Sequence, residues 1–572
     1  MEKKVVVVGG SAAGITAGIT ARRHYPEAEI TIIRKEDKVL VPCGIPYIFG
    51  TVGTPEKNLI PDAILEKNDI HLVKDGVESI DRDNKVVVTG SGSKIGYDKL
   101  VLATGSLPIV LPLPGVEKKN VFTVQKDSAY LQSLSEALEK ASDLVVIGGG
   151  FIGVEFADEC KKKSKDLNVT IVELLSHCLQ LACDEEFCLR AEERLVERGV
   201  KILPEEKAEA ILGGDAVEQV KLASGKTLKA DVVILGVGVV PNSQLAADAG
   251  LKIGARKSIH VDQYMRTSDK DIFACGDCCE KFSSFTKEPS GLRLASIAAI
   301  EARIAGANLF ELNRSNKGVI GIFSTAVNGL TVGTAGLTEN AARKAGYDVV
   351  AEVASGPDRH PGGMPGCSDL YVKLIFERKS GKIVGGQVSG GVSGGELLNA
   401  ISAAITAGMT ADDVATFQMG THPALTASPI AYQLVNAAES AIKHIRKPKI
   451  LIVEDDSDFV GAIKAVLASQ PYGVDVANNR LDAMKKIEAE KPDLLLLDIM
   501  LDEVDDGFTI CRELKTDPEY WSIPILAMSA IAKEAGVEPG LGEHFKADDF
   551  LAKPIKAAEL LEKIKKHLYA TQ

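Results

Sequence analysis

The sequence lacks the features that mark membrane and secreted proteins. No apolar run approaches the roughly 20 residues that a membrane-spanning helix needs. The apolar run Val5 to Val8 near the start ends at Gly9-Gly10, which is too short for a signal-peptide core. Aromatic residues make up only 5% of the chain, and hydrophobic residues make up 45%. We therefore expect a globular protein of the cytoplasm that has no membrane partner.

A positive charge excess and a cysteine framework are also missing. The formal net charge is −13, which disfavours a nucleic-acid partner. The ten cysteines follow no short, regular spacing, as expected in a reducing compartment. Cys43 is followed by no other cysteine until Cys160, so a neighbouring dithiol is excluded.

At 572 residues the chain is too long for one core, and a first nucleotide-binding unit opens it. A buried parallel strand is predicted at Val5 to Val8, and a glycine-rich turn then opens a helix. Small residues there let the backbone close on a pyrophosphate at the helix N-terminus. The residues of this turn are Gly9, Ser11 and Gly14. Ser11 replaces the second glycine of the usual GxGxxG, and the acid for a ribose, Glu36, follows Arg34-Lys35. An ordinary strand–turn–helix remains the alternative.

A second copy of this pattern is more complete. The strand Leu144 to Ile147 is followed by a full GxGxxG fingerprint, and the next strand ends in Glu173, placed to accept from a ribose 2′-hydroxyl. The fingerprint glycines are Gly148, Gly150 and Gly153. The residues after Glu173 contain no arginine for a 2′-phosphate, which favours NADH over NADPH.

Two further strand ends favour a flavin as the second nucleotide. One strand ends in Ala103-Thr104-Gly105, and another ends in Cys275-Gly276-Asp277. An aspartate at a strand end can accept hydrogen bonds from a ribityl chain, although Gly-Asp pairs are also common in simple turns.

Cys43 is the candidate redox thiol. It stands between Pro42 and Gly44, shortly after the first nucleotide unit. Such a thiol can cycle through a mixed disulfide, a persulfide or a sulfenate. We expect a helix to start at Gly44, so that its N-terminus lowers the thiol pKa. The alternative is a buried structural cysteine. Cys275 and Cys278 are read as ordinary thiols, with a resolving role for one of them left open.

In this order, the motifs resemble the two-dinucleotide flavoprotein disulfide reductases. The Cys-Gly-Ile-Pro-Tyr segment is most similar to the branch of coenzyme A disulfide reductases, persulfide reductases and NADH oxidases. The resemblance implies an FAD domain, an NADH domain and an α+β dimerisation domain. Their expected limits are residues 1–115 plus 245–320, residues 116–244, and residues 321–445.

The resemblance also implies roles for individual residues. Asp277 would contact FAD, and Glu155 would lie near the nicotinamide. His422 would donate a proton beside the flavin of the partner subunit, with a polar histidine packed at the dimer seam as the alternative. His422 lacks the usual glutamate five residues later, because Ala427 stands there. Arg22 and Arg23 match a basic pair that binds coenzyme A phosphates, with a solvated helix end as the equal alternative.

The last part of the chain, residues 446–572, resembles the receiver domain of response regulators. Apolar strands end in Glu454-Asp455-Asp456, in Asp498, in Ser529 and before Lys553. Alternating strands and helices predict a flavodoxin-like sheet with its site at the carboxyl ends of the strands. By the resemblance, Asp498 accepts phosphate, Asp455 and Asp456 bind Mg²⁺ with it, and Lys553 pairs with the phosphate. Ser529 would be the switch hydroxyl and Phe550 the rotating aromatic.

The sequence thus predicts an α/β chain with two Rossmann-like domains, a dimerisation domain and a receiver. The expected activity is NADH-dependent, FAD-dependent reduction of a small disulfide, persulfide or polysulfide, including a coenzyme A derivative. The expected partners are a second copy of the chain and a sensor histidine kinase or phosphotransfer protein. The alternatives are an NADH oxidase with a Cys43 sulfenate, and a redox sensor with the receiver as its output.

Overall fold

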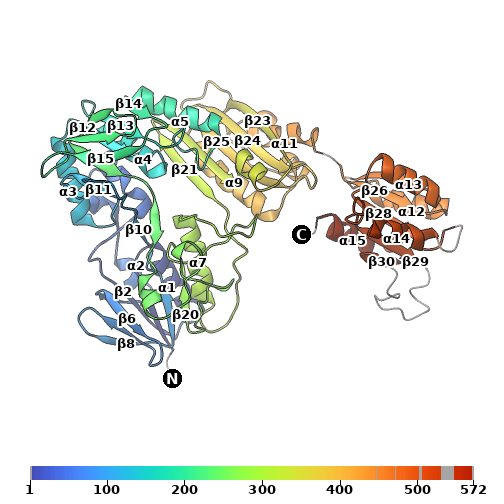
Figure 1. The fold of residues 1–572 in the computed structure, drawn as a ribbon, viewed down its shortest axis with the longest axis horizontal. Helices are drawn as coiled ribbons and strands as arrows, with labels where there is room; N and C mark the ends of the chain where they lie inside the picture. Colours follow the sequence, from blue (N-terminus) through green and yellow to red (C-terminus); the bar gives the residue numbers. More distant parts are fainter. Residues whose placement is uncertain (1–2, 446, 471, 502–505, 530–545, 570–572) are drawn as a thin grey trace.

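Four α/β units follow one another in the computed structural model, and the predicted fold class is confirmed. The structure describes residues 3–445, 447–470, 472–501, 506–529 and 546–569. Three units form one larger body, and the fourth stands beside it, joined through a single segment (Figure 1). None of the helices in these described ranges is both long and apolar enough to cross a bilayer.

The first unit contains a five-stranded parallel sheet in the order β20-β9-β1-β2-β5. Its continuous β-branched and aliphatic runs are buried, as expected for strands covered on both faces. The strands are β1 (Lys4–Val8), β2 (Glu29–Arg34), β5 (His71–Lys74), β9 (Lys99–Leu102) and β20 (Ile272–Ala274). Helices α1 (Ala12–His24) and α7 (Ala295–Ala307) pack together on the sheet. Smaller elements of this unit are β3 (Val39–Leu40), β4 (Leu59–Ile60), α2 (Ala63–Glu66), β6 (Val77–Asp81), β7 (Val86–Thr89) and β8 (Lys94–Gly96).

The second unit repeats this architecture with the order β11-β18-β12-β13-β14. Its strands are β11 (Val121–Thr123), β12 (Asp143–Ile147), β13 (Asn168–Val172), β14 (Val200–Leu203) and β18 (Val232–Leu235). Its helices are α3 (Ser128–Lys140), α4 (Phe151–Lys163) and α5 (Glu185–Arg198). A small antiparallel sheet contains β15 (Ala208–Leu212), β16 (Gln219–Leu222) and β17 (Thr227–Lys229). The pair β10 (Ser106–Pro108) and β19 (Val239–Pro241) connects the first two units, and α6 (Gln244–Asp248) follows.

The third unit is an antiparallel sheet in the order β21-β22-β25-β24-β23. Its strands are β21 (Ile322–Val327), β22 (Leu330–Gly336), β23 (Val349–Pro357), β24 (Asp369–Glu377) and β25 (Ile383–Gly390). Its helices are α8 (Glu339–Lys344), α9 (Ser393–Ala407), α10 (Ala411–Thr416) and α11 (Gln433–Ile442). The helices α9 and α11 pack on the sheet and close one apolar core.

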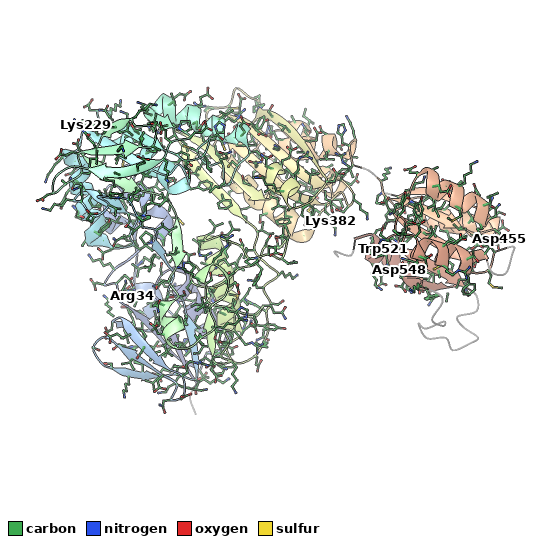
Figure 2. All side chains as sticks on the ribbon, viewed as in Figure 1. Arg34, Lys229, Lys382, Asp455, Trp521 and Asp548 are labelled. Atoms are coloured by element: carbon green, nitrogen blue, oxygen red, sulfur yellow. The ribbon has the colours of Figure 1, made fainter. Side chains whose placement is uncertain are left out.

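The fourth unit is a parallel sheet in the order β27-β26-β28-β29-β30 with apolar cores on both faces. Its strands are β26 (Lys449–Val453), β27 (Gly473–Ala477), β28 (Leu494–Asp498), β29 (Ile525–Ser529) and β30 (Asp549–Ala552). Its helices are α12 (Ser457–Leu467), α13 (Arg480–Ala489), α14 (Asp506–Thr516) and α15 (Ala557–Tyr569). Asp455, at the carboxyl edge of the sheet, lies on the side away from the larger body (Figure 2). The predicted domain limits, including that at residue 446, stay predictions.

Candidate functional site

The turn between β1 and α1 fits a dinucleotide pyrophosphate. Gly9 has a φ of +114°, and a Cβ on it would lie 2.2 Å from the carbonyl oxygen of Ala103. A Cβ on Gly14 would lie 1.8 Å from the carbonyl oxygen of Gly9. Ser11 caps α1 without a side-chain hydrogen bond, and the first turn of the helix contains no acid. The helix N-terminus therefore offers its amides to an anion rather than to its own side chains.

The carboxyl end of β2 is organised by Arg34. Its side chain is buried, forms an ion pair of 2.7 Å with Asp62 and donates to the carbonyl oxygens of Glu36 and Asp37. A Cβ on Gly10 would lie 2.5 Å from Arg34 Cδ, so Gly10 makes room for this arginine. Arg34 thereby holds Glu36 in a fixed turn. From the sequence, Arg34 was only a departure from the nucleotide-binding fingerprint. The contact of Glu36 with a ribose stays a prediction.

The two remaining strand ends of the first unit lie beside the linking pair of strands. Thr104 Oγ1 donates to the carbonyl oxygen of Asn242 over 2.6 Å, and Gly105 has a φ of +72°. Ser106 Oγ donates to Asp277 Oδ2 over 2.8 Å. Gly276 has a φ of +81°. The turns at Ala103-Thr104-Gly105 and Gly276-Asp277 are therefore brought to one edge of the sheet, as a flavin site requires.

A buried ion pair that the sequence did not reveal supports the Gly276-Asp277 turn. Lys281 Nζ donates to the carbonyl oxygen of Gly276 over 2.6 Å and lies 3.0 Å from Glu301 Oε2. Glu301 Oε2 in turn accepts from the Gly276 amide over 2.9 Å. Cys275 and Cys278 lie in the same fully buried region, where burial raises both thiol pKa values. This environment gives no support to a resolving role for either cysteine.

The turn between β12 and α4 fits the second nucleotide. Gly148 has a φ of +107°, and a Cβ on Gly153 would lie 1.9 Å from the carbonyl oxygen of Gly148. Gly150 caps α4, whose first turn contains no acid. Glu173 is held in place by the amides of Gly149 (2.5 Å) and Leu175 (2.7 Å). Its fixed carboxylate suits a ribose diol better than a phosphate, in line with the NADH prediction.

Cys43 is exposed and lies among charged residues from distant parts of the chain. Pro42–Gly44 and Pro46–Phe49 form two short 3₁₀ turns. Although Cys43 is exposed at the surface, the protein around its sulfur partly removes it from water, and this desolvation, followed by the charge of Glu155, raises the pKa of Cys43. The expected helix that would lower this pKa is therefore absent from the segment. The positive charge of Lys126 opposes this rise in the pKa of Cys43, and Lys126 Nζ lies 4.0 Å from Asp277 Oδ2. The sequence reading missed Lys126 because it precedes α3, far from Cys43 in the chain.

Glu155 lies on α4 and accepts a hydrogen bond of 2.9 Å from Thr325 Oγ1 on β21. Burial raises the pKa of Glu155 to about 7, and the Thr325 hydrogen bond opposes this rise. Burial together with Glu155 also raises the pKa of Tyr47 to about 12. Cys43 and Glu155 are therefore electrostatically coupled at the boundary of the first three units. The nicotinamide contact predicted for Glu155 stays a prediction.

His422 lies in an exposed loop of the third unit. Its Nδ1 accepts from the Ala424 amide over 3.2 Å, and its backbone amide donates to Thr426 Oγ1 over 3.0 Å. Leu425 and Ile430 in the same loop are strongly exposed. Among the described contacts none joins His422 to Cys43 of the same chain. A role at Cys43 of a second protomer stays a prediction.

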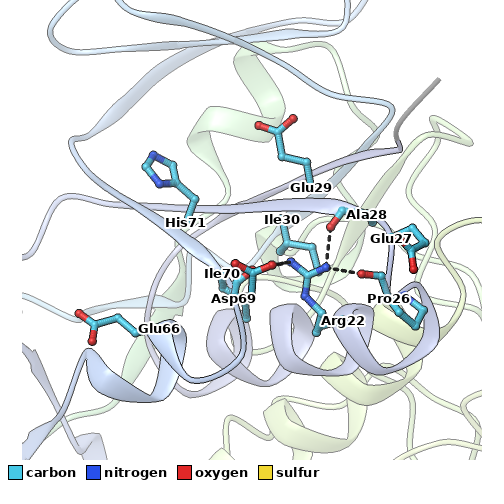
Figure 3. A pocket seen from close by; sticks show the side chains of 10 residues that line it. All are labelled: Arg22, Pro26, Glu27, Ala28, Glu29, Ile30, Glu66, Asp69, Ile70 and His71. Carbon is cyan, nitrogen blue, oxygen red and sulfur yellow. Dashed lines mark hydrogen bonds and ion pairs between the residues drawn. The ribbon is translucent and has the colours of Figure 1, made fainter.

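Arg22 lines a pocket of about 470 Å³ together with four acidic residues and His71 (Figure 3). Its guanidinium donates to the carbonyl oxygens of Asn68, Pro26, Ala28 and Asp69. Through these hydrogen bonds Arg22 joins the end of α1 to the segment that precedes β5. Arg23 is exposed. The geometry supports a structural role for Arg22, and the coenzyme A contact predicted for the pair is not favoured at Arg22.

The carboxyl edge of the fourth unit gathers three carboxylates and a lysine. Oxygen atoms of Glu454, Asp455 and Asp498 all lie within 4.8 Å of one another. Lys553 Nζ lies 2.7 Å from Asp498 Oδ2 and 2.7 Å from Glu454 Oε2. Burial raises the pKa of Glu454 to about 7. Oxygen ligands of this kind suit Mg²⁺, which would neutralise the clustered charge.

The structure differs from the prediction at Asp456. Its carboxylate caps α12 and accepts from the amides of Asp458 (2.9 Å) and Phe459 (3.1 Å). Because β26 ends at Val453, Glu454 takes the place in the cluster that was expected for Asp456. Ser529 ends β29 as a buried residue, and Phe550 is half-buried on β30. Both lie at the positions expected for the switch residues, whose movement stays a prediction.

Models of known protein families match three parts of the chain, the first of which spans the first two units. A model described as pyridine nucleotide-disulphide oxidoreductase matches residues 3–302, and one for the dimerisation domain of the same family matches residues 322–430. A response regulator receiver domain model matches residues 450–565.

Similar proteins include enzymes with two kinds of acceptor. An NADH oxidase of Enterococcus faecalis is 31% identical over 422 residues, which is 72% of this chain and 94% of that protein. An NAD(P)H coenzyme A polysulfide/persulfide reductase of Pyrococcus horikoshii is 32% identical over 398 residues, covering 68% and 87%. The solved structure of an NAD-dependent persulfide reductase from A. fulgidus aligns with a TM-score of 0.72 at 28% identity, covering 99% of this chain and 97% of that one.

Proposed function

Since the chain belongs to the pyridine nucleotide-disulphide oxidoreductase family, we propose that it is an NADH-dependent flavoprotein that reduces a small disulfide, persulfide or polysulfide through Cys43. The observation that carries the proposal is the position of Cys43. Its thiol is exposed, and it is close enough to Asp277 of the flavin-type turn and to Glu155 of α4 for both carboxylates to raise its pKa.

The residues of the two turns would hold the cofactors. Gly9, Ser11, Gly14 and Asp277 would hold FAD, and the turn opening α4, together with Glu173, would hold NADH. When bound, FAD would relay two electrons from NADH to the sulfur atoms at Cys43. Lys126 supplies the positive charge that favours the thiolate of Cys43, which is the reactive form.

The chemical steps follow from the single thiol. The Cys43 thiolate attacks one sulfur of the substrate and forms a mixed disulfide, while the other sulfur leaves as a thiolate or sulfide and takes a proton. Two electrons from NADH would then cleave the mixed disulfide, which restores the Cys43 thiolate and releases the second sulfur as a thiolate or sulfide that takes a proton. In the proposed homodimer, His422 on its exposed loop would supply the proton to the second protomer.

The test is anaerobic oxidation of NADH by the purified protein with coenzyme A disulfide, coenzyme A persulfide and polysulfide, followed by air alone. Fast anaerobic turnover with one sulfur acceptor supports the proposal and identifies the substrate class. Turnover that needs air, with no sulfur acceptor used, would overturn it.

NADH oxidation by oxygen is the second candidate function, because relatives named NADH oxidase share about the same identity with the chain. In that reaction Cys43 would cycle through a sulfenate. The same assay separates the two activities.

We also propose that the fourth unit is a working receiver. Asp498 would accept a phosphoryl group from a histidine kinase or phosphotransfer protein, with Mg²⁺ held by Glu454, Asp455 and Asp498. Phosphorylation would then act on the flavoprotein, or the flavoprotein's redox state would act on the receiver. The test compares the rate of Asp498 phosphorylation in reduced and oxidised protein, and NADH turnover before and after phosphorylation. If neither rate changes, the receiver and the flavoprotein do not influence each other.

A further inference from the structure

The chain's one tryptophan lies at the edge of the receiver opposite to its phosphorylation site. Trp521 precedes β29 at the amino ends of the strands, whereas Asp455 and Asp498 lie at the carboxyl ends. Its side chain is 61% exposed. A tryptophan can bury roughly 150 to 250 Å² of surface, so covering this side chain would remove a large apolar area from water.

The loop that presents this tryptophan, residues 517–522 (the Trp521 loop), is rigidly built. Lys491 Nζ donates to the Glu519 carbonyl oxygen over 2.6 Å and to Ser522 Oγ over 3.1 Å. Lys515 Nζ donates to the carbonyl oxygens of Trp521 (3.2 Å) and Ile523 (2.9 Å). The loop's own backbone bonds add Tyr520 and Trp521 amides onto the Asp517 carbonyl. The loop is therefore well ordered, and its hydrogen bonds hold the Trp521 side chain outward.

The tether between the receiver and the dimerisation domain is short. Ile445 packs against the core of the dimerisation domain and lies against Gly381. The Pro448 carbonyl oxygen already accepts from Gly473 inside the receiver over 2.9 Å. Residues 446 and 447 alone separate these anchors, so three Cα–Cα steps span at most about 11 Å.

The Trp521 loop lies close to this tether. The strand order β26-β28-β29 places Pro524, at the start of β29, two strands from Pro448, or about 10 Å at ordinary strand spacing. The tether therefore keeps the loop near the surface of the dimerisation domain from which the receiver emerges. In Figure 2, Trp521 lies on the side of the receiver that faces Lys382.

The two facing surfaces have opposite charge. The turn between β24 and β25, residues 378–382 (the basic turn), exposes Lys379 and Lys382, and Lys443 and Lys447 are exposed beside it. Arg378 ties this turn to the tether by donating to the His444 carbonyl oxygen over 2.6 Å. The nearby acids Asp348 and Glu352 pair with Arg378 and His444.

The Trp521 loop carries the complementary charge. Asp517 and Glu519 are exposed on it, while its lysines donate to the loop itself. We propose that the receiver docks through the Trp521 loop onto the basic turn of its own chain. Trp521 would pack on the aliphatic stems of Lys379 and Lys382, with Asp517 and Glu519 beside their ammonium groups. This arrangement leaves the Asp498 edge open to a phosphoryl donor.

The fluorescence of Trp521 in the full-length holoprotein tests the docking directly, because no other tryptophan contributes. We compare acrylamide quenching of the parent with that of the variant K379E/K382E. A control, K67E/K94E, makes the same charge change at exposed lysines of the first unit. The proposal predicts that quenching rises at least about twofold in K379E/K382E and stays at the parent's level in the control. It predicts the same rise in the parent at about 1 M salt, where the Debye length is about 3 Å.

A charge swap adds a second readout. The variant E519K should also raise quenching, and combining it with K379E/K382E should recover part of the protection. Equal quenching in the parent, K379E/K382E and the control would overturn the proposal. Quenching that depends on protein concentration would also overturn it, because docking within one chain is independent of concentration.

Discussion

Thr325 donates its hydroxyl group to Glu155 Oε1 over 2.9 Å, so the first strand of the dimerisation domain is bonded to the helix that opens the second nucleotide turn. Burial raises the pKa of Glu155 to about 7, while this bond opposes the rise. The protonation of a carboxyl group near Cys43 therefore depends on how the two domains pack.

Glu155 should make stability depend on pH. Its pKa of about 7 in the folded protein exceeds its model value of 4.5, so the folded state holds a proton that the unfolded chain releases between these values. The free energy of unfolding should therefore fall as pH rises through this window, by up to about 3 kcal/mol. In E155Q this part of the fall should vanish, as measured by chemical denaturation across the window.

The comparison with E155Q is needed because Glu454 has a pKa of about 7 as well and remains in both proteins. The exposed residue Glu136 provides the control E136Q, which should keep the parent's slope. In T325V the window should extend to higher pH, because the bond that lowers the pKa of Glu155 is lost. Parallel profiles for parent and E155Q would contradict the assignment.

Lys126 should set the reactivity of Cys43. Replacing it in K126M removes a positive charge that lowers the pKa of Cys43, so this pKa should rise. The measurement is the pH dependence of iodoacetamide labelling of Cys43 in the reduced protein. The control K140M changes an exposed lysine at the end of α3 and should leave the profile in place. A K126M profile that overlays the parent's would remove Lys126 from the site.

The sequence could predict the nucleotide turns because their chemistry is local. Gly9, Gly14, Gly148 and Gly153 are needed where backbone atoms approach closely, and the fingerprint records this need directly. Lys126 and Thr325 could not be predicted in this way. They reach Cys43 and Glu155 from other domains, and neither belongs to a motif.

The packing of the second unit against the third should depend on one buried lysine, Lys373. Lys373 Nζ lies 3.1 Å from Asp184, 2.7 Å from Glu186 and 2.9 Å from Glu339. The variant K373M leaves the buried Asp184 carboxylate without its cation, which should cost about 3 to 5 kcal/mol of stability. Thermal unfolding of K373M beside K344M, an exposed lysine on α8, measures this cost. Equal unfolding temperatures for the two variants would show that the cluster contributes little.

Asp455 and Asp456 should differ in function although they are neighbours. Asp455 belongs to the carboxylate cluster, whereas Asp456 caps α12. In D455N, Mg²⁺-dependent labelling of Asp498 by acetyl phosphate should be lost. In D456A the labelling should persist, with a loss of about 0.5 to 2 kcal/mol in receiver stability. Loss of labelling in D456A as well as in D455N would instead support the prediction that both aspartates hold Mg²⁺.

Asp455 and Asp456 also show what the sequence pattern could not predict. The sequence predicted a carboxylate cluster after β26, since acids follow an apolar strand. It named Asp455 and Asp456 as the two acids of the cluster, whereas Glu454 and Asp455 lie there in the structure. Which acids lie there depends on the residue at which the strand ends and the helix cap begins. The segment around Cys43 is a similar case, because two separate 3₁₀ turns, each starting at a proline, replace the helix that was expected from Gly44.

Anaerobic turnover of the variant C43S tests the central claim most directly. The account predicts that C43S still accepts electrons from NADH into its flavin, seen as bleaching of the flavin absorbance, but no longer reduces any sulfur acceptor that the parent uses. The variant C367S, at a half-buried cysteine of the third unit, should behave as the parent does. Sulfur turnover by C43S at the parent's rate would contradict the account.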